Sequence, residues 1–191
     1  KNIFIKFFIP LSYIFIFIVQ LRRLLYSLNL ISITKFDVPV IIVGNIVAGG
    51  SGKTPFVIWL VNYLKLNGYS PGIISRGYGR LNNSKTKAVN PTSDPLFVGD
   101  EPVIISKNTN CPVLVSKKRS DGVRELIKNY SCNIVISDDG LQHYSLDRDI
   151  EIVVIDGERR FGNGYYIPAG PLREPLSRLS DTDIIVSKYV A

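Results

Sequence analysis

The most constraining feature of the sequence is an apolar run, a glycine-rich loop and a helix-length segment in succession. The run Val40–Val43 is β-branched and is typical of a buried strand. The segment Pro55–Leu66 is predicted to be helical, and Pro55 falls in the first turn, where a missing N–H costs nothing. Glycines between them let backbone N–H groups point inward, and the helix N-terminus adds a favourable dipole. This order predicts a phosphate-binding loop.

The loop carries the residue types expected of a nucleotide phosphate site. Its residues are Val47, Ala48, Gly49, Gly50, Ser51, Gly52, Lys53 and Thr54. In such loops the lysine reaches the β- and γ-phosphates, and the following hydroxyl ligates Mg²⁺, which here assigns Lys53 and Thr54. Val47 stands where the usual pattern has its first glycine, but the small residues after it keep the loop tight. A glycine-rich turn with an accidental Lys-Thr pair is the alternative interpretation.

Short apolar runs alternate with helix-length segments along the rest of the chain. The further predicted strands are Gly72–Ser75, Pro112–Val115, Asn133–Ser137, Glu151–Ile155 and Asp183–Val186, and a second helix is expected at Ser120–Tyr130. Strands alternating with helices predict an α/β fold of the phosphate-loop NTPase type, with a mostly parallel, doubly wound sheet. The segment Arg80–Asp94, rich in Asn, Ser, Thr and Pro, is predicted to be a long surface loop.

Acidic residues follow the predicted strands, where ligands bind in open α/β sheets. Asp138 and Asp139 come directly after Asn133–Ser137, and one of them is expected to hold Mg²⁺; a structural role in capping the next turn is the alternative. Asp156 follows another strand in the same way and is the weaker metal candidate. Asp100 lies beside a glycine, where it is placed like a general base for a substrate hydroxyl or like a helix N-cap.

The N-terminal segment Ile3–Leu21 is almost wholly apolar and is closed by Arg22 and Arg23. A spanning helix needs about 20 apolar residues, and Lys6 and Pro10 shorten the uninterrupted part of this one. We expect a monotopic or interfacial helix, with a single membrane span and an ordinary packed helix as alternatives.

Composition excludes several classes of protein and partner. The 191 residues carry 23 Lys and Arg against 16 Asp and Glu, and the net charge of +7 favours anionic partners. Nucleic acid is not expected, because the sequence has no stacking-aromatic or helix-turn-helix pattern. Two cysteines and one histidine leave no plausible zinc set, and we interpret Cys111 and Cys132 as reduced, buried apolar residues.

Five motifs in this order resemble the tetraacyldisaccharide 4'-kinase family of the lipid A pathway. They are Gly44-Asn45 with Gly49–Pro55, Ser75–Gly79, Val98–Pro102, Asp138–His143, and Phe161–Gly164 with Pro168–Pro175. The resemblance runs from the apolar N-terminus to about residue 188. The family's loop also lacks the usual first glycine, which accounts for Val47.

The resemblance implies transfer of the ATP γ-phosphate to the 4'-hydroxyl of tetraacyldisaccharide 1-phosphate, giving lipid IVA at the cytosolic face of the inner membrane. It implies ATP and Mg²⁺ as cofactors, Asp100 as the base, and Lys53, Asp138 and Asp139 as further catalytic residues. Thr54 and the two adjacent aspartates would bind the metal. The candidate substrate-binding residues, for each of which a structural role is the alternative, are Arg76, Arg119, His143 and Arg173.

The expected organisation is a membrane-associated segment, residues 1–36, and a phosphate-loop kinase domain, residues 37–191. Family members are considerably longer and place an assisting histidine in their second half, and this sequence has no Met, so we expect a fragment with a truncated second lobe. A phosphate-loop switch or partitioning ATPase and an inactive ATP-binding remnant remain as alternatives. The sequence does not indicate an oligomeric state.

Overall fold

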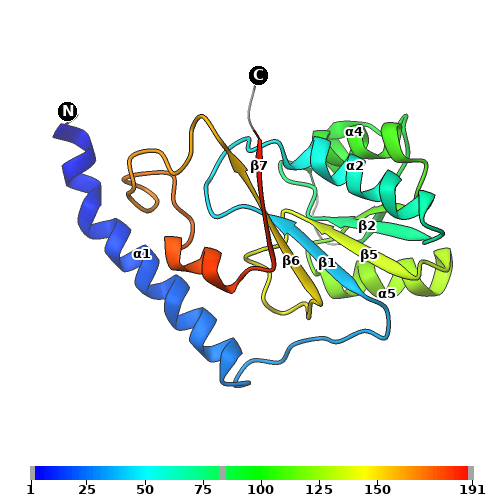
Figure 1. The fold of residues 1–191 in the computed structure, drawn as a ribbon, viewed down its shortest axis with the longest axis horizontal. Helices are drawn as coiled ribbons and strands as arrows, with labels where there is room; N and C mark the ends of the chain where they lie inside the picture. Colours follow the sequence, from blue (N-terminus) through cyan, green and yellow to red (C-terminus); the bar gives the residue numbers. More distant parts are fainter. Residues whose placement is uncertain (1–2, 82–84, 189–191) are drawn as a thin grey trace.

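The computed structural model describes residues 3–81 and 85–188 and shows a seven-stranded sheet between helices (Figure 1). The strand order is β3-β4-β2-β5-β1-β6-β7, and every pair is parallel except β3 with β4. The strands are β1 Val40–Gly44, β2 Pro71–Ser75, β3 Lys87–Val89, β4 Val113–Val115, β5 Ile134–Asp138, β6 Ile150–Asp156 and β7 Ile184–Lys188. The predicted α/β fold with a mostly parallel sheet is confirmed.

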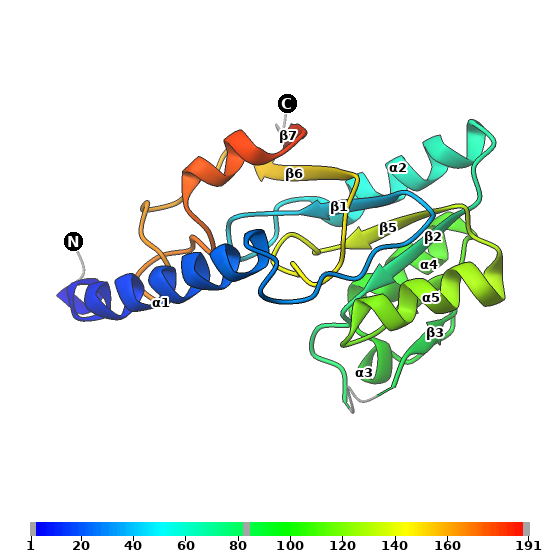
Figure 2. The same cartoon turned by 90° about the horizontal axis from the view of Figure 1, so that it is seen from below.

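Helices cover both faces of the sheet because its inner strands are apolar on both sides. The helices are α1 Ile3–Ser27, α2 Lys53–Leu66, α3 Pro95–Val98, α4 Asp100–Thr109, α5 Arg119–Tyr130 and the 3₁₀ helix η1 Leu176–Asp181. Apolar side chains of α2 and α4 pack on one face, and those of α5 pack on the other. Figure 2 shows the molecule from below, with α1 extending beyond the sheet.

The register of the central strands places the functional loops at one edge. β1 lies between β5 and β6, with Val43 opposite Asp138 and Gly44 opposite Val153. The carboxyl ends of these parallel strands therefore meet where the glycine-rich loop begins, which is where open α/β sheets bind ligands.

The prediction of a long loop over Arg80–Asp94 is wrong in part. Residues 87–89 form β3, which pairs antiparallel with β4, with Lys87 opposite Val115. The Ser106 hydroxyl of α4 also donates a hydrogen bond of 3.1 Å to the Val89 carbonyl oxygen. A three-residue edge strand is set by these long-range contacts, since so short a segment gives no readable periodicity. Residues 82–84 of the predicted loop lie outside the described residues.

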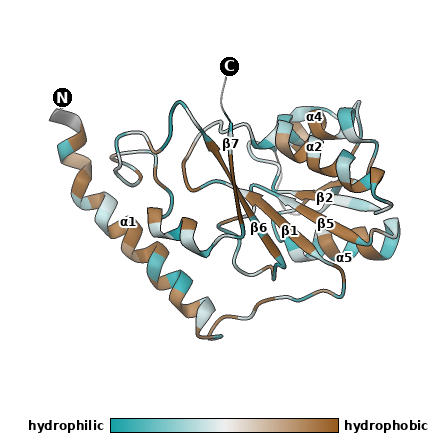
Figure 3. Ribbon diagram, in the orientation of Figure 1, coloured by the Kyte–Doolittle hydropathy of each residue, from teal (hydrophilic) through white to brown (hydrophobic). Residues whose placement is uncertain are grey.

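Helix α1 runs continuously from Ile3 to Ser27 and contains Pro10, so the interruption that Pro10 makes in the apolar sequence does not end the helix. A proline inside a helix removes one backbone hydrogen bond, and the turns on either side of Pro10 retain theirs. Ser12 and Ile16 are buried against the rest of the molecule, and most of the exposed side chains of residues 5–27 are apolar. Figure 3 colours α1 by hydropathy and shows mainly hydrophobic residues, in brown, along this helix at the flank of the molecule.

Candidate active site

The glycine-rich loop joins the carboxyl end of β1 directly to the N-terminus of α2. Gly52 precedes the helix with φ +79°, a left-handed conformation that favours glycine, and a Cβ there would lie 2.8 Å from the Lys188 side chain. Asn45 accepts a hydrogen bond of 3.1 Å from the Val47 N–H through its Oδ1. Because Gly52 is the last residue before α2, Lys53 is the first residue of the helix, where backbone N–H groups and the helix dipole favour an anion.

Lys53 and Arg173 converge on Asp139. The Lys53 Nζ lies 3.3 Å from Asp139 Oδ1, and Arg173 Nη1 lies 3.2 Å from Oδ1 and 3.3 Å from Oδ2. Burial alone would raise the pKa of Asp139, but the charges of Lys53, Arg173 and Arg119 outweigh it and lower the pKa below its usual value. Asp139 is therefore an ionised carboxylate that holds two cations beside the loop.

Asp138 has the opposite environment. Its side chain is buried, Ser75 Oγ donates to its Oδ2 at 3.3 Å, and its Oδ1 has no hydrogen-bond partner among the described residues. Burial, followed by the charges of Glu101 and Asp139, raises the pKa of Asp138 to about 6. A buried carboxylate oxygen without a partner is costly and is typical of a group that meets a ligand or an ion.

The residues at this edge fit a magnesium ion by the chemistry of their donors. Mg²⁺ prefers oxygen ligands, usually one or two carboxylates with substrate phosphates and water. The unpartnered Oδ1 of Asp138 and the Thr54 hydroxyl in the first turn of α2 are donors of this kind. Among residues 3–81 and 85–188, no cluster of three His, Cys, Asp or Glu side chains suits a metal, so the nucleotide would have to supply ligands.

Arg119 contacts the backbone of the two aspartates. Its guanidinium is buried and donates through Nη2 to the carbonyl oxygens of Asp138 at 2.6 Å and Asp139 at 2.8 Å. Burial lowers its pKa to about 10, against the opposing effect of the aspartate charges. These contacts fix the backbone of the turn that carries both carboxylates, and Asp139 adopts φ +47° there.

The structure places Asp100 at the start of α4, directly after Gly99. Gly99 has φ +91°, and a Cβ at this position would lie 3.1 Å from the Tyr78 carbonyl oxygen and 3.2 Å from Gly77 Cα. The Ser75–Gly79 and Val98–Pro102 motifs therefore pack backbone to backbone. The Asp100 carboxylate is exposed and makes no hydrogen bond or ion pair with the described part of the chain, whereas the charge of its neighbour Glu101 acts on Asp138.

His143 lies within a group of arginines. Burial, followed by the charges of Arg119, Arg148, Arg22 and Arg76, lowers its pKa to about 4. Its Nε2 lies 3.2 Å from the Ser145 Oγ. The imidazole is neutral at pH 7, and the surrounding positive charge favours an anion.

The carboxylate of Asp156, the weaker metal candidate, stabilises the turn that follows β6. Its Oδ1 accepts hydrogen bonds from the N–H groups of Glu158 at 3.0 Å and Arg159 at 2.9 Å. The backbone hydrogen bond from Arg159 is the main cause of its lowered pKa. These contacts account for Asp156 without a metal.

Comparison with known proteins gives a consistent result at every level. A family model described as tetraacyldisaccharide-1-P 4'-kinase matches residues 4–191. Tetraacyldisaccharide 4'-kinases from Coxiella burnetii (strain RSA 331) and Methylobacillus flagellatus are 54% and 57% identical, over 95% and 93% of this chain. The matches cover 55% and 53% of those proteins, so the chain spans about half the length of the curated relatives it matches.

A solved structure agrees with the sequence matches. The crystal structure of LpxK from Aquifex aeolicus in complex with ATP superposes with a TM-score of 0.89 at 34% identity, covering 98% of this chain and 59% of that one. The family match extends over nearly the whole sequence and includes both the apolar helix and the phosphate loop. The chain therefore belongs to the tetraacyldisaccharide-1-phosphate 4'-kinase family.

Proposed function

We propose that the protein is an ATP-dependent lipid kinase that phosphorylates the 4'-hydroxyl of tetraacyldisaccharide 1-phosphate to form lipid IVA in lipid A biosynthesis. The main supporting observation is the phosphate loop whose Lys53 is paired with Asp139 beside the buried Asp138. The names of the relatives and the ATP complex of the structural neighbour support the same reaction.

The lipid substrate requires a surface that meets a bilayer, and α1 supplies the best candidate. Residues Ile5–Ser27 are long and apolar enough to cross a membrane by length and composition, a criterion that signal sequences also meet. Exposed apolar side chains include Phe7, Phe17 and Ile18, and Arg22 follows them. We propose that residues 1–36 form a monotopic anchor at the cytosolic face of the inner membrane, with a single span as the alternative.

Residues 37–191 would then form the kinase domain, which binds ATP at the phosphate loop. The backbone N–H groups of the loop and the N-terminus of α2 would hold the phosphates, and Lys53 would neutralise charge on the transferred group. When bound, Mg²⁺ supplies further neutralisation of the phosphate oxygens. Thr54 and Asp138, with Asp139, would hold it.

The acceptor hydroxyl would be activated by Asp100. This carboxylate is exposed at the start of α4, so a substrate can reach it. The next residue, Glu101, is close enough for its charge to raise the pKa of Asp138, so Asp100 lies in the same region as the buried carboxyl. An aspartate outside an ion pair is available to accept a proton from a hydroxyl group.

The substrate phosphate would meet the positive charge around His143. Arg76 is exposed and close enough to act on both His143 and Arg119. Arg119 and Arg173 contribute charge from their places beside the two aspartates. Of these residues, Arg76 is the most available for direct contact with a ligand.

The test is transfer of label from γ-labelled ATP to tetraacyldisaccharide 1-phosphate in detergent micelles with Mg²⁺. It should be run on this chain and on a version extended to the natural stop codon. Label in the lipid supports the kinase. ATP binding with no label in any lipid from either version would contradict it and favour a switch ATPase or an inactive remnant.

Asp100→Ala tests the proposed base in whichever version is active. We expect kcat to fall about 10²-fold or more, with little change in ATP affinity, because the base acts on the acceptor hydroxyl. Asp37→Asn removes another exposed aspartate as a matched control. An unchanged rate in Asp100→Ala would remove this residue from the mechanism.

A further inference from the structure

The apolar helix α1 contains a buried serine whose hydroxyl is shared with a distant segment. Ser12 is 2% exposed. Its Oγ accepts a hydrogen bond of 3.1 Å from the Ala169 N–H and lies 2.9 Å from the Tyr166 carbonyl oxygen and 3.0 Å from the Phe8 carbonyl oxygen. A hydroxyl has one proton to donate, so Ser12 joins α1 to residues Tyr165–Glu174, which we call the strap.

Backbone hydrogen bonds join the strap to the phosphate loop. The Ala48 N–H donates to the Pro171 carbonyl oxygen at 2.8 Å, and the Arg173 N–H donates to the Ile46 carbonyl oxygen at 2.7 Å. Between these bonds, Val47 and Leu172 form an antiparallel bridge. The first residues of the phosphate loop are thus paired with the strap as in a short sheet.

Two side chains of the strap extend this contact to the charged residues of the site. Arg173 holds Asp139, which in turn pairs with Lys53. Glu174 is fully buried and accepts a hydrogen bond of 2.7 Å from Gln142 Nε2, which also donates to the Asn45 carbonyl oxygen at 3.0 Å. A displacement of the strap would therefore move both the backbone and the cations that face the phosphates.

We propose that Ser12 is a positioning residue that couples the placement of α1 to the geometry of the phosphate loop through the strap. The coupling rests on the proposed function, in which α1 meets the membrane while the loop binds ATP. Figure 1 shows the strap, in orange, between α1 and the sheet. Coupled packing of this kind transmits a shift because each segment has few alternative arrangements.

The first experiment is hydrogen exchange by NMR in Ser12→Ala, with Ser27→Ala as the matched control. Ser27 lies in the same helix, but its hydroxyl donates only to Leu24 within α1. We expect Ser12→Ala to speed exchange at the Ala48 and Arg173 amides about tenfold, and to leave the Ile73 amide of β2 unchanged. Ser27→Ala should match the unmodified chain at all three positions.

ATP affinity provides a readout that a merely structural role would not change. At temperatures where both variants are folded, we expect Ser12→Ala to bind ATP about 3- to 10-fold more weakly, the effect of losing one or two hydrogen bonds. Faster exchange at Ala169 alone, with normal ATP affinity and normal exchange at Ala48 and Arg173, would overturn the proposal. Ser12 would then only anchor α1.

A second measurement uses the unmodified chain and does not depend on the folding of a variant. Phosphatidylglycerol vesicles should slow exchange at the Ala48 and Arg173 amides by fixing α1 on a bilayer, and unchanged exchange with vesicle-bound protein would overturn the coupling. Absence of ATP binding by the unmodified chain would instead contradict the proposed kinase function. The coupling between α1 and the phosphate loop would still be tested by the hydrogen-exchange rates of the Ala48 and Arg173 amides.

Discussion

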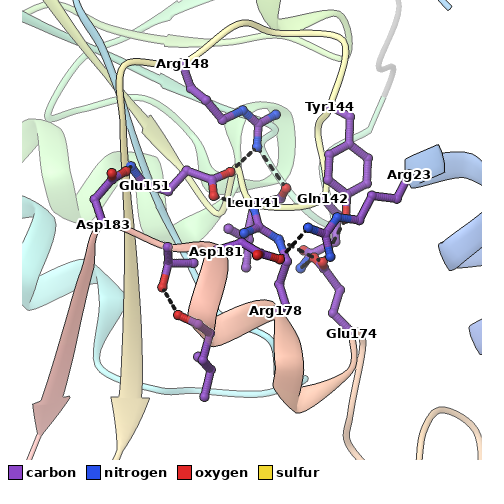
Figure 4. A network of polar contacts seen from close by, with 12 residues as sticks. Arg23, Leu141, Gln142, Tyr144, Arg148, Glu151, Glu174, Arg178, Asp181 and Asp183 are labelled. Atoms are coloured by element: carbon purple, nitrogen blue, oxygen red, sulfur yellow. Dashed lines mark hydrogen bonds and ion pairs between the residues drawn. The ribbon is translucent and has the colours of Figure 1, made fainter. Parts of the chain in front are cut away.

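Two clusters of buried charge lie in the same domain and are neutralised in different ways. The first, which we call the arginine–glutamate network, consists of Arg148, Glu151, Glu174 and Arg178 (Figure 4). The second, the phosphate-loop cluster, consists of Lys53, Asp138, Asp139 and Arg173. Both hold two cations and two carboxylates.

The arginine–glutamate network is closed on itself. Glu151 accepts from Arg148 Nη1 at 2.7 Å and from Arg178, whose Nε lies 3.4 Å from Glu174 Oε2. Glu174 also accepts 2.7 Å hydrogen bonds from Tyr144 and Gln142. The network borders a cavity of about 460 Å³ at the amino ends of β6 and β7, at the opposite edge of the sheet from the phosphate loop. Its carboxylates have their partners within the protein.

The phosphate-loop cluster is unevenly paired. Both cations bind Asp139, and Asp138 keeps a buried oxygen without a partner among the described residues. A cluster in which every carboxylate is paired with a cation contributes to the stability of the fold. A cluster that contains an unpaired carboxylate with a raised pKa is typical of a site that binds a ligand or a metal. Variants in the first cluster should therefore change stability, and variants in the second should change ligand binding and catalysis.

The largest expected effect is on catalysis, in Lys53→Ala. In the proposed reaction Lys53 would face the transferred phosphate, so its loss should lower kcat/KM by about 10³-fold or more, as for other charge-stabilising groups in phosphoryl transfer. Asp139 retains Arg173, so the free energy of unfolding should change little. The label-transfer assay and thermal unfolding measure the two effects, with Lys128→Ala on the exposed face of α5 as the control. A large loss of stability with normal turnover would reverse the assignment of the two clusters.

Glu151→Gln should have the largest effect on stability. It leaves Arg148 without an ion-pair partner among the described residues and Arg178 with Glu174 alone, and breaking a buried pair costs about 3–5 kcal/mol. Urea unfolding measures this change in the free energy of unfolding, and Glu158→Gln on an exposed turn is the matched control. ATP affinity of the folded fraction should stay within a factor of about two. A stability loss below about 1 kcal/mol would show that the network is not needed for the fold.

The phosphate-loop cluster was largely predictable from the sequence, because its residues follow local rules. A β-branched run, glycines and Lys53-Thr54 predict the loop, and Asp138 comes directly after a buried strand. The parallel sheet then brings these strand ends together. The sequence could not show that Asp139, rather than Asp138, pairs with Lys53. That choice depends on the left-handed conformation of Asp139 and on the burial of Arg119.

The arginine–glutamate network was not predicted, because its members come from two segments far apart in the sequence, 148–151 and 174–178. Glu174 lies in a proline-rich stretch that reads as a surface loop, and only its inclusion in a family motif marks it. Glu151 occupies the start of a buried strand, where its charge is tolerable because Arg178 of η1 faces it. No local periodicity predicts a contact between β6 and a 3₁₀ helix. Glu101 was likewise missed beside Asp100, since its effect on Asp138 depends on the packing of two glycine turns.

The pH dependence of stability gives a smaller effect that separates the two aspartates. A carboxyl whose pKa rises from 3.8 to about 6 on folding stabilises the protein below pH 4 and loses that stabilisation as the pH rises to 6, a change of roughly 3 kcal/mol. Asp138→Asn should remove this decline, whereas Asp37→Asn should keep it. Chemical denaturation between pH 4 and 7 measures the difference. An identical profile in Asp138→Asn would mean that the buried carboxyl titrates normally.

The smallest expected effect concerns His143, whose contribution to the pH dependence of stability has the opposite sign to that of Asp138. Its pKa is lowered to about 4, so its neutral form stabilises the fold above pH 6.5, and that stabilisation is lost as the pH falls to 4. Over the same interval Asp138 gains stabilisation as His143 loses it, so His143 offsets part of the decline toward pH 6, and His143→Gln should make that decline steeper. The residue is partly exposed, and solvent screening makes its share smaller than that of Asp138.

The sequence contains one histidine, so the imidazole signals in an NMR titration belong to His143 without further assignment. Burial, followed by the charges of nearby arginines, depresses the pKa of His143, so the midpoint should lie near pH 4, and inorganic phosphate should raise it by neutralising the charge of the exposed Arg76. His143→Gln keeps a polar side chain and provides the stability control. A midpoint near 6.5 that phosphate does not move would mean that no anion site surrounds this residue, and anion binding at this edge of the sheet would then be assigned to the phosphate-loop cluster.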